Sequence, residues 1–123
     1  MKKNNLSKRA LTLLAALMLC IASMNTVLAA GYTDIGYVTQ VWTQNADNYD
    51  TFAVQLSITH IDPDNCASGN QVTWYRIKSE GNAGYKTFVS TILAAAAAKK
   101  QVKLYLDGCV DVKPRPTNAF VYY

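Results

Sequence analysis

Residues 85–109, YKTFVSTILAAAAAKKQVKLYLDGC, decide the fold because they hold one helix and the strand that follows it. Apolar side chains recur there at the spacing of a single helix face, at Tyr85, Phe88, Val89, Ile92, Leu93 and Ala96. The five alanines of residues 94–98 favour a helix intrinsically, and Lys99 and Lys100 suit the negative end of its dipole. The pattern predicts a helix over residues 85–100 and a strand over residues 102–106.

Four other segments have the β-branched, aromatic or alternating character of strands, namely residues 33–43, 52–59, 71–78 and 118–123. Gly36 interrupts the first of them and indicates a bulge or a close approach of backbone. Turn-forming residues separate the segments in residues 44–50, 60–70, 79–84 and 107–117. The predicted order is β-β-β-α-β-β in one domain, residues 30–123. This mainly β order with one helix is that of an OB-fold-like, five-stranded Greek-key barrel.

Residues 1–29 have the pattern of a secretory signal peptide. Four bases open the segment, Lys2, Lys3, Lys8 and Arg9, and no acid accompanies them. The apolar stretch that follows is about 20 Å long as a helix, shorter than the roughly 30 Å hydrocarbon core of a bilayer. We expect cleavage after Ala29, with Ala30 as the second choice and an uncleaved anchor as the alternative. The protein is then exported, periplasmic or secreted, from a Gram-negative bacterium.

The charge balance changes once the predicted leader is removed. The whole chain has twelve bases and eight acids, but four of the bases lie in residues 1–29. Residues 30–123 therefore carry equal numbers of both, whereas a nucleic-acid binder needs a surplus of bases to neutralise phosphates. We expect no nucleic-acid partner. We also expect no membrane span, because no later apolar run reaches the length that one requires.

Two cysteines, Cys66 and Cys109, remain after the leader, which takes Cys20 with it. Two cysteines in an oxidising compartment usually pair, so we expect a disulfide between them. The alternatives are two free thiols or a metal-binding pair, for which the sequence offers no further ligands nearby.

The strand order, the length of the exported part and the sequence AAAAKKQVKLYLDGC at residues 95–109 together suggest a family. They resemble small exported bacterial proteins similar to the B subunit of subtilase-type AB5 cytotoxins. The resemblance spans about residues 32–123 and implies an OB-fold, a pentameric ring with helices around its pore, glycan binding and a toxin A subunit as partner. The cysteines stand elsewhere than in the toxin, and no glycan-binding residue of the toxin has a counterpart here.

Catalytic patterns are weak in this chain. His60 is the single histidine, and Ser57 or Ser68 with Asp62 would have to complete a triad without a nucleophile elbow. No phosphate-binding loop, dinucleotide fingerprint or zinc motif is present, so we expect no enzyme and no cofactor.

A calcium loop is the one metal site that the sequence suggests. Asp62, Asp64 and Asn65 offer oxygen ligands, but Ala67 stands where an EF-hand loop needs glycine. Such residues in a proline-containing loop more often cap turns through their own backbone. We expect no metal site.

A binding face is the functional pattern with most support. All thirteen aromatic residues lie beyond the leader, and Trp74 and Tyr75 are neighbours in a strand, so they point to opposite faces. The sequence leaves open which one points outward. Together with the loop before residue 50, they give six candidate ligand-binding residues, Asn45, Asp47, Asn48, Tyr49, Trp74 and Tyr75. A flat aromatic ring beside amides and carboxylates suits a sugar; the alternative is that these rings fill the core.

The sequence thus predicts an exported, non-catalytic binding module that recognises glycans or another surface ligand. The alternative is a periplasmic structural or protein-interaction protein that docks through the β-face or the alanine-rich helix. An inhibitor of an extracellular hydrolase is a third class, without residues that support it.

Overall fold

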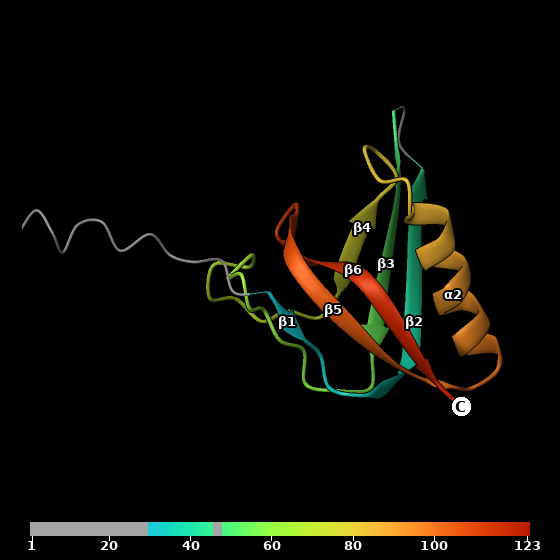
Figure 1. The fold of residues 1–123 in the computed structure, drawn as a ribbon. Helices are drawn as coiled ribbons and strands as arrows, with labels where there is room; N and C mark the ends of the chain where they lie inside the picture. Colours follow the sequence, from blue (N-terminus) through green and yellow to red (C-terminus); the bar gives the residue numbers. More distant parts are fainter. Residues whose placement is uncertain (1–29, 46–47) are drawn as a thin grey trace, which may run out of the picture.

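The computed structural model describes residues 30–45 and 48–123 (Figure 1). The predicted signal peptide and Asp47 lie outside the described residues. Within them, one antiparallel sheet of six strands accompanies a single helix, which confirms the prediction of a mainly β chain with one helix. The elements are β1 (Gly31–Tyr32), β2 (Gly36–Asn45), β3 (Asp50–Leu56), β4 (Tyr75–Lys78), α2 (Tyr85–Ala97), β5 (Gln101–Val110) and β6 (Lys113–Tyr122).

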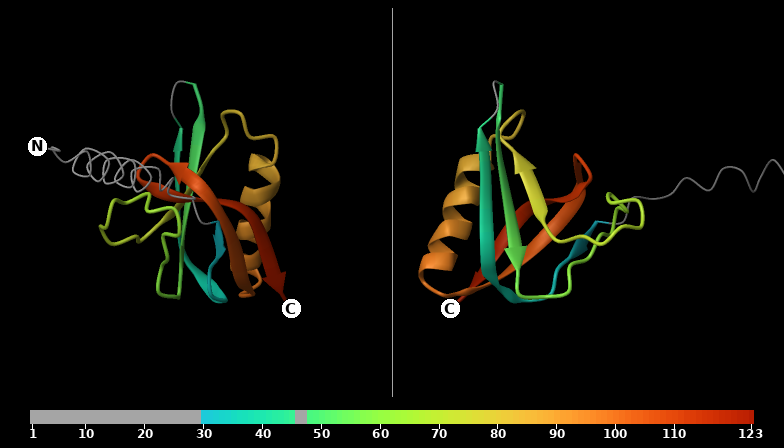
Figure 2. Two further views of the ribbon diagram at one scale, coloured as in Figure 1. Left: turned by 60° about the vertical axis from the view of Figure 1, so that its left-hand side comes forward. Right: turned by 180° about the vertical axis from the view of Figure 1, so that it is seen from behind.

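Strand β5 joins the two parts of the sheet. One edge of β5 pairs with β1 near Leu106 and with β2 at Gln101 and Val102, and its other edge pairs with β6. From β2 the sheet continues through β3 to β4. Seen from behind, α2 lies beside β2, and the long connection from β3 to β4 extends away from the helix (Figure 2). The sheet therefore curls around one core, with the helix on one side.

The break between β1 and β2 has a local cause. Thr33 leaves the strand and is buried; its hydroxyl accepts a hydrogen bond from the N–H of Leu104 at 2.9 Å, and its own N–H donates to the carbonyl of Leu104. At Gly36 the chain then passes so close to the residues just after β3 that a Cβ atom would lie 2.5 Å from Cγ2 of Ile58. Of the predicted strand over residues 33–43, only the part from Gly36 onward is a strand, and the two residues of β1 precede it; Gly36 marks the close approach of backbone that its position indicated.

The predicted loop over residues 107–117 is wrong. Strand β5 continues to Val110, a turn at Asp111 and Val112 follows, and β6 starts at Lys113. Pro114 and Pro116 indicated a loop, but among the described strands β6 pairs with β5 alone, so two missing N–H donors are tolerated on its other edge. Three other elements end or begin short of the prediction: β3 ends at Leu56 rather than at residue 59, residues 71–74 precede β4 rather than belong to it, and α2 ends at Ala97.

The core lies between the inner side of the sheet and one face of the helix. Phe88, Ile92 and Ala95 are the buried residues of α2, and the Phe88 ring meets that of Phe52 edge to face at 6.5 Å. From β5, the core takes the alternating residues Val102, Leu104 and Leu106. Tyr75 of β4 is also completely buried in it.

The disulfide is present between Cys66 and Cys109, whose Cα atoms lie 5.5 Å apart, as predicted. It ties the β3–β4 connection to β5 itself, since Cys109 lies in the strand rather than in a loop. A second link stands beside it, because the N–H of Gly108 donates to Oδ2 of Asp64 at 2.6 Å. The connection, which has no strand of its own, is thereby fixed to the sheet.

The helix ends in a Schellman motif. The N–H of Lys99 donates to the carbonyl of Ala96 at 3.2 Å, and that of Lys100 donates to the carbonyl of Ala95 at 2.9 Å. Lys99 is the left-handed residue of this motif, with φ of 51°. Glycine is the usual residue there, because a side chain costs about 1–2 kcal/mol in that conformation.

Replacement of both cysteines tests the disulfide. The bridge closes a loop with a sequence separation of 43 residues, and in the chain-entropy model such a loop stabilises the fold by about 4 kcal/mol. We expect the C66S/C109S variant to lose stability of this order in urea unfolding, and a reductant to bring the unmodified chain to the same value. A loss below about 1 kcal/mol would contradict this role.

The conformation of Lys99 gives a second prediction. The variants K99G and K99A both remove the lysine charge, so their difference reports on the left-handed backbone alone. We expect K99G to be more stable than K99A by about 1 kcal/mol in thermal or urea unfolding. Equal stability of K99G and K99A would contradict this prediction, because it would show that residue 99 can adopt another backbone conformation at no cost.

Candidate functional site

The outer side of β2, β3 and β4 brings together polar and aromatic side chains. Strand pairing places Trp42 opposite Ala53, and Ala53 opposite Arg76, in one row across the three strands. The next pair of positions along β3 and β4 is Thr51 opposite Lys78. The alternate residues, Val54 and Tyr75 among them, point into the core. We call this side of β2–β3–β4 the outer-sheet face.

A notch lies at the centre of the outer-sheet face. Trp42, Ala53, Trp74 and Arg76 line it, and its volume is about 170 Å³. Ala53 is its floor and is 1 % exposed, whereas Trp42 is 39 % exposed. Enclosed small-ligand pockets usually measure about 300–1,000 Å³, so this notch is suited to one flat group rather than to a whole engulfed ligand.

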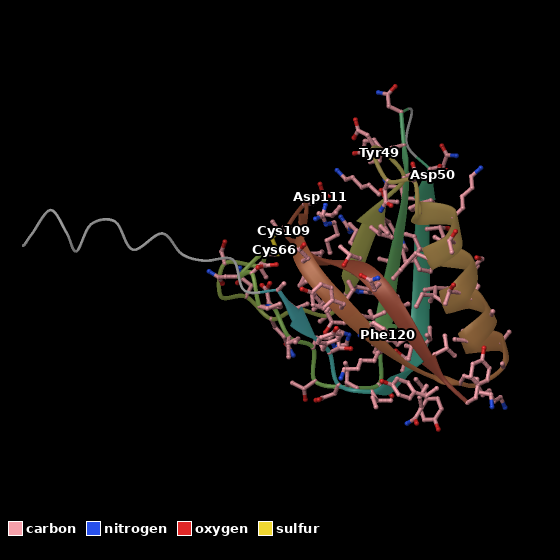
Figure 3. All side chains as sticks on the ribbon, viewed as in Figure 1. Tyr49, Asp50, Cys66, Cys109, Asp111 and Phe120 are labelled. Carbon is pink, nitrogen blue, oxygen red and sulfur yellow. A yellow bond between two sulfur atoms is a disulfide. The ribbon has the colours of Figure 1, made fainter. Side chains whose placement is uncertain are left out.

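Charged residues extend the face from the notch toward the β2–β3 turn. The Arg76 guanidinium lies 5.2 Å from the centre of the Trp42 ring, and one of its nitrogens binds Asp111 at 3.0 Å. Asp111 also binds Nζ of Lys78 at 3.0 Å, and that ammonium lies 4.5 Å from the centre of the Tyr49 ring. Figure 3 shows Tyr49 and Asp111 near the same end of the molecule. These contacts thus form one continuous series, from Trp42 through Arg76, Asp111 and Lys78 to Tyr49.

The Asp111 carboxylate balances the two cations. Its hydrogen bonds to Lys78 and Arg76 hold its pKa below the ordinary value, and the bond to Asp111 raises the pKa of Lys78. Asp111 and Lys78 therefore both stay charged near neutral pH. Because water screens these exposed ion pairs, the Asp111 carboxylate positions Arg76 and Lys78 rather than stabilising the fold.

A wider polar pocket opens where β4 separates from β3. Pairing between the strands stops at Val54 and Tyr75, and the chain before Tyr75 turns away from β3. The resulting pocket has a volume of about 740 Å³. Its polar lining comes from Gln55, Ser57, Thr59, His60, Asp62, Asn70, Gln71 and Thr73. The pocket and the notch are neighbours along the polypeptide, because Thr73 directly precedes Trp74 and Gln55 is two residues after Ala53.

The six predicted ligand-binding residues do not form one group. Trp74 and Tyr49 belong to the outer-sheet face, and Asn45 and Asn48 are exposed near the β2–β3 turn. Tyr75 is buried and its hydroxyl accepts a hydrogen bond from the N–H of Ile61, so its assignment as a surface ligand residue is wrong. The same burial raises the pKa of Tyr75 to about 12. Trp74, not Tyr75, is therefore the residue available to a ligand.

Two residues of the notch, Trp42 and Arg76, escaped the sequence prediction. Trp42 lies in the part of β2 from Thr39 to Asn45, which is exposed on both sides, so alternation of polar and apolar residues could not single it out. In the sequence, Arg76 is distinguished only as a basic residue between Tyr75 and Ile77. The signal that identifies both is the register, which places them on either side of Ala53.

The residues considered for catalysis or for calcium have structural partners. Nε2 of His60 accepts a hydrogen bond from the N–H of Leu56 at 3.3 Å, and the ring lies 5.0 Å from that of Tyr75. Both carboxylate oxygens of Asp62 accept backbone N–H bonds at 2.8 Å, from Cys66 and Ala67. Asp62 thus caps a turn, which is the role favoured for it by its sequence context. These contacts hold the β3–β4 connection in place.

His60 makes the stability of the fold depend on pH. Burial lowers its pKa from 6.5, because the neutral ring is favoured inside the protein. As the pH falls below 6.5, the unfolded chain takes up a proton that the folded chain resists, so folding becomes less favourable. We expect the unmodified chain to lose more stability on acidification than H60Q, which retains a hydrogen-bond acceptor. Urea unfolding at a series of pH values measures both, and parallel curves would contradict the assignment.

Comparison with known proteins adds no assignment. No protein-family model matches this chain, and searches of curated proteins and of solved structures likewise find no match. Within the described residues, no helix is long and apolar enough to cross a membrane. The resemblance to toxin B subunits stays a prediction, and the functional argument depends on the geometry of the outer-sheet face.

Proposed function

We propose that this protein is an exported, non-catalytic module that binds a glycan on its outer-sheet face. The observation that carries the proposal is the notch, which two tryptophans, Trp42 and Trp74, line together with the small residue Ala53. An indole ring offers a flat apolar surface to the C–H side of a sugar, and a floor as small as alanine leaves room for that sugar to approach.

Polar groups around the notch suit the hydroxyls of the same ligand. Gln40 and Gln55 are paired across β2 and β3, two residues along the strands from Trp42 and Ala53 and therefore on the same face. Amide side chains both donate and accept hydrogen bonds, as sugar hydroxyls do. The pocket of about 740 Å³ beyond Gln55 then gives room for further sugar units of a chain.

We propose that the sheet is an OB-type barrel, which supports the choice of this face. The strand pairs β2–β3, β3–β4, β2–β5 and β5–β6 follow the order expected of such a barrel, counting β1 and β2 as one broken strand. Strands β4 and β6 lie side by side in the remaining position. OB-folds bind oligosaccharides and oligonucleotides on the face of their second and third strands, which correspond to β3 and β4 here.

Export is the part of the proposal that the disulfide supports. A bridge such as Cys66–Cys109 persists in oxidising compartments and is rare in the cytosol. Together with the leader pattern of residues 1–29, it favours the periplasm or the exterior of the cell as the place of action.

The proposal is tested by the variant W42A. We expect a glycan array to identify ligands for the unmodified chain and calorimetry to measure them. Truncation of a central aromatic anchor costs about 2 kcal/mol, so W42A should weaken binding roughly thirtyfold. The matched control is F120A, which removes an exposed aromatic ring of similar accessibility from another face: Phe120 is 43 % exposed and Trp42 is 39 %. Absence of glycan binding, or equal effects of both variants, would overturn the proposal.

A protein-interaction module is the second candidate, and the helix supports it. Leu93 is 45 % exposed, and Ala94, Ala97 and Ala98 lie exposed beside it on the outer side of α2 and its cap. Methyl groups allow another backbone to approach closely, as the pentameric ring and the toxin A subunit implied by the resemblance would require. This candidate needs a stable assembly in solution, which light scattering measures directly.

A further inference from the structure

A second exposed face lies on the outer side of β1, β5 and β6. Since Val102, Leu104 and Leu106 point into the core, the alternate residues of β5 point outward. Strand pairing adds neighbours to each of them: Tyr32 opposite Tyr105, Phe120 opposite Lys103, and both Tyr37 and Tyr122 opposite Gln101. We call these residues the aromatic–lysine face.

Three aromatic rings of this face, those of Tyr32, Tyr105 and Phe120, form a contacting group, and most of the face's aromatic residues are exposed. The Tyr32 ring lies 4.8 Å from that of Tyr105 and 5.9 Å from that of Phe120, and Nζ of Lys103 lies 4.8 Å from the centre of the Tyr32 ring. Tyr32 is 54 % exposed and Tyr37 is 49 % exposed. Isolated exposed aromatics are ordinary on a protein surface, but a contiguous group of them marks a site of interaction.

Positive charge borders the same face. Lys99 and Lys100 follow α2 and, with Tyr37, line a cavity of about 410 Å³. Nζ of Lys100 also lies 5.5 Å from the centre of the ring of the last residue, Tyr123. Two acids lie near this face, and its three lysines outnumber them: Asp107 is exposed in β5 two residues after Tyr105, and Asp34 lies between β1 and β2.

We propose that the aromatic–lysine face binds the surface of a bilayer that contains anionic phospholipids. Tyrosine is favoured at membrane interfaces, because its ring enters the apolar boundary while its hydroxyl stays hydrated. The three lysines complement the phosphates, and the cavity beside Tyr37 admits a headgroup. This site is distinct from the proposed glycan site: Figure 3 shows Phe120 in the lower part of the molecule, away from Tyr49 and Asp111.

The charges favour a bilayer over a second copy of this chain. In a symmetric dimer built on this face, the same surface patch would meet itself. Lys103 and the lysine pair of each copy would then face a patch in which these three lysines outnumber the one carboxylate at an outward position of β5, that of Asp107. Like charges across an interface cost affinity, whereas an anionic lipid surface neutralises all three lysines.

The test is co-sedimentation of the protein, as purified from the producing cell, with two kinds of vesicle. One is pure phosphatidylcholine, and the other is an equimolar mixture of phosphatidylcholine and phosphatidylglycerol. We expect binding to the mixed vesicles, with a partition coefficient that falls about fivefold in K103Q and roughly a hundredfold in K99Q/K100Q/K103Q. The matched control is K86Q, which makes the same charge change in the first turn of α2 and should bind like the unmodified chain.

The aromatic part of the proposal is tested separately from the electrostatic part. The variant Y37S/Y122S retains every lysine and should also lose affinity for the mixed vesicles, while circular dichroism checks that each variant is folded. All variants share the same N-terminal segment, so a difference between K86Q and K103Q cannot come from that segment. Equal sedimentation of these two variants would overturn the proposal. A dimer in light scattering that Y37S/Y122S disrupts, without vesicle binding, would assign the face to a second copy instead.

Discussion

The backbone pairing of β5 on both of its edges is the interaction on which the rest of the structure depends. On one edge β5 holds β1 and β2, which come from the start of the described chain, and on the other it holds β6, which comes from the end. The pairings with β1 and β2 close loops of many residues, so they are formed at a considerable cost in chain entropy, whereas β6 follows β5 through the short turn at Asp111 and Val112. Burial of Val102, Leu104 and Leu106 offsets that cost, and the Cys66–Cys109 bridge lowers it by shortening the loops of the unfolded chain.

The period of two in a strand then gives each part of the sheet two different sides. In β5 the even-numbered residues 102–106 form the core, and the odd-numbered residues place tyrosine, lysine and glutamine on the surface. In β3 and β4 the same rule puts Phe52 and Tyr75 inside and Ala53 and Arg76 outside. The two candidate binding surfaces are therefore the outer sides of two parts of one curled sheet, and a single core supports both.

The sequence predicted those features that depend on neighbours along the chain. The alternation around Phe52 and Val54 identified β3, the stripe through Phe88 and Ile92 identified the helix, and the cysteine count identified the bridge. Features that depend on partners across the sheet were missed or left open. Pro114 and Pro116 fit a strand only because one edge of β6 is free of pairing among the described strands. Whether Trp74 or Tyr75 points outward follows from the pairing of Tyr75 with Val54, which no local pattern contains.

The short turn at Asp111 has a consequence for the kinetics of recognition. Two long, flexible side chains, Arg76 and Lys78, are held by one carboxylate before any ligand arrives. Their rotational freedom is thus already restricted in the free protein, and a ligand that lands on Trp42 does not have to freeze them on arrival. A platform prepared in this way favours rapid capture from dilute solution, which suits the proposed role as an exported glycan-binding module.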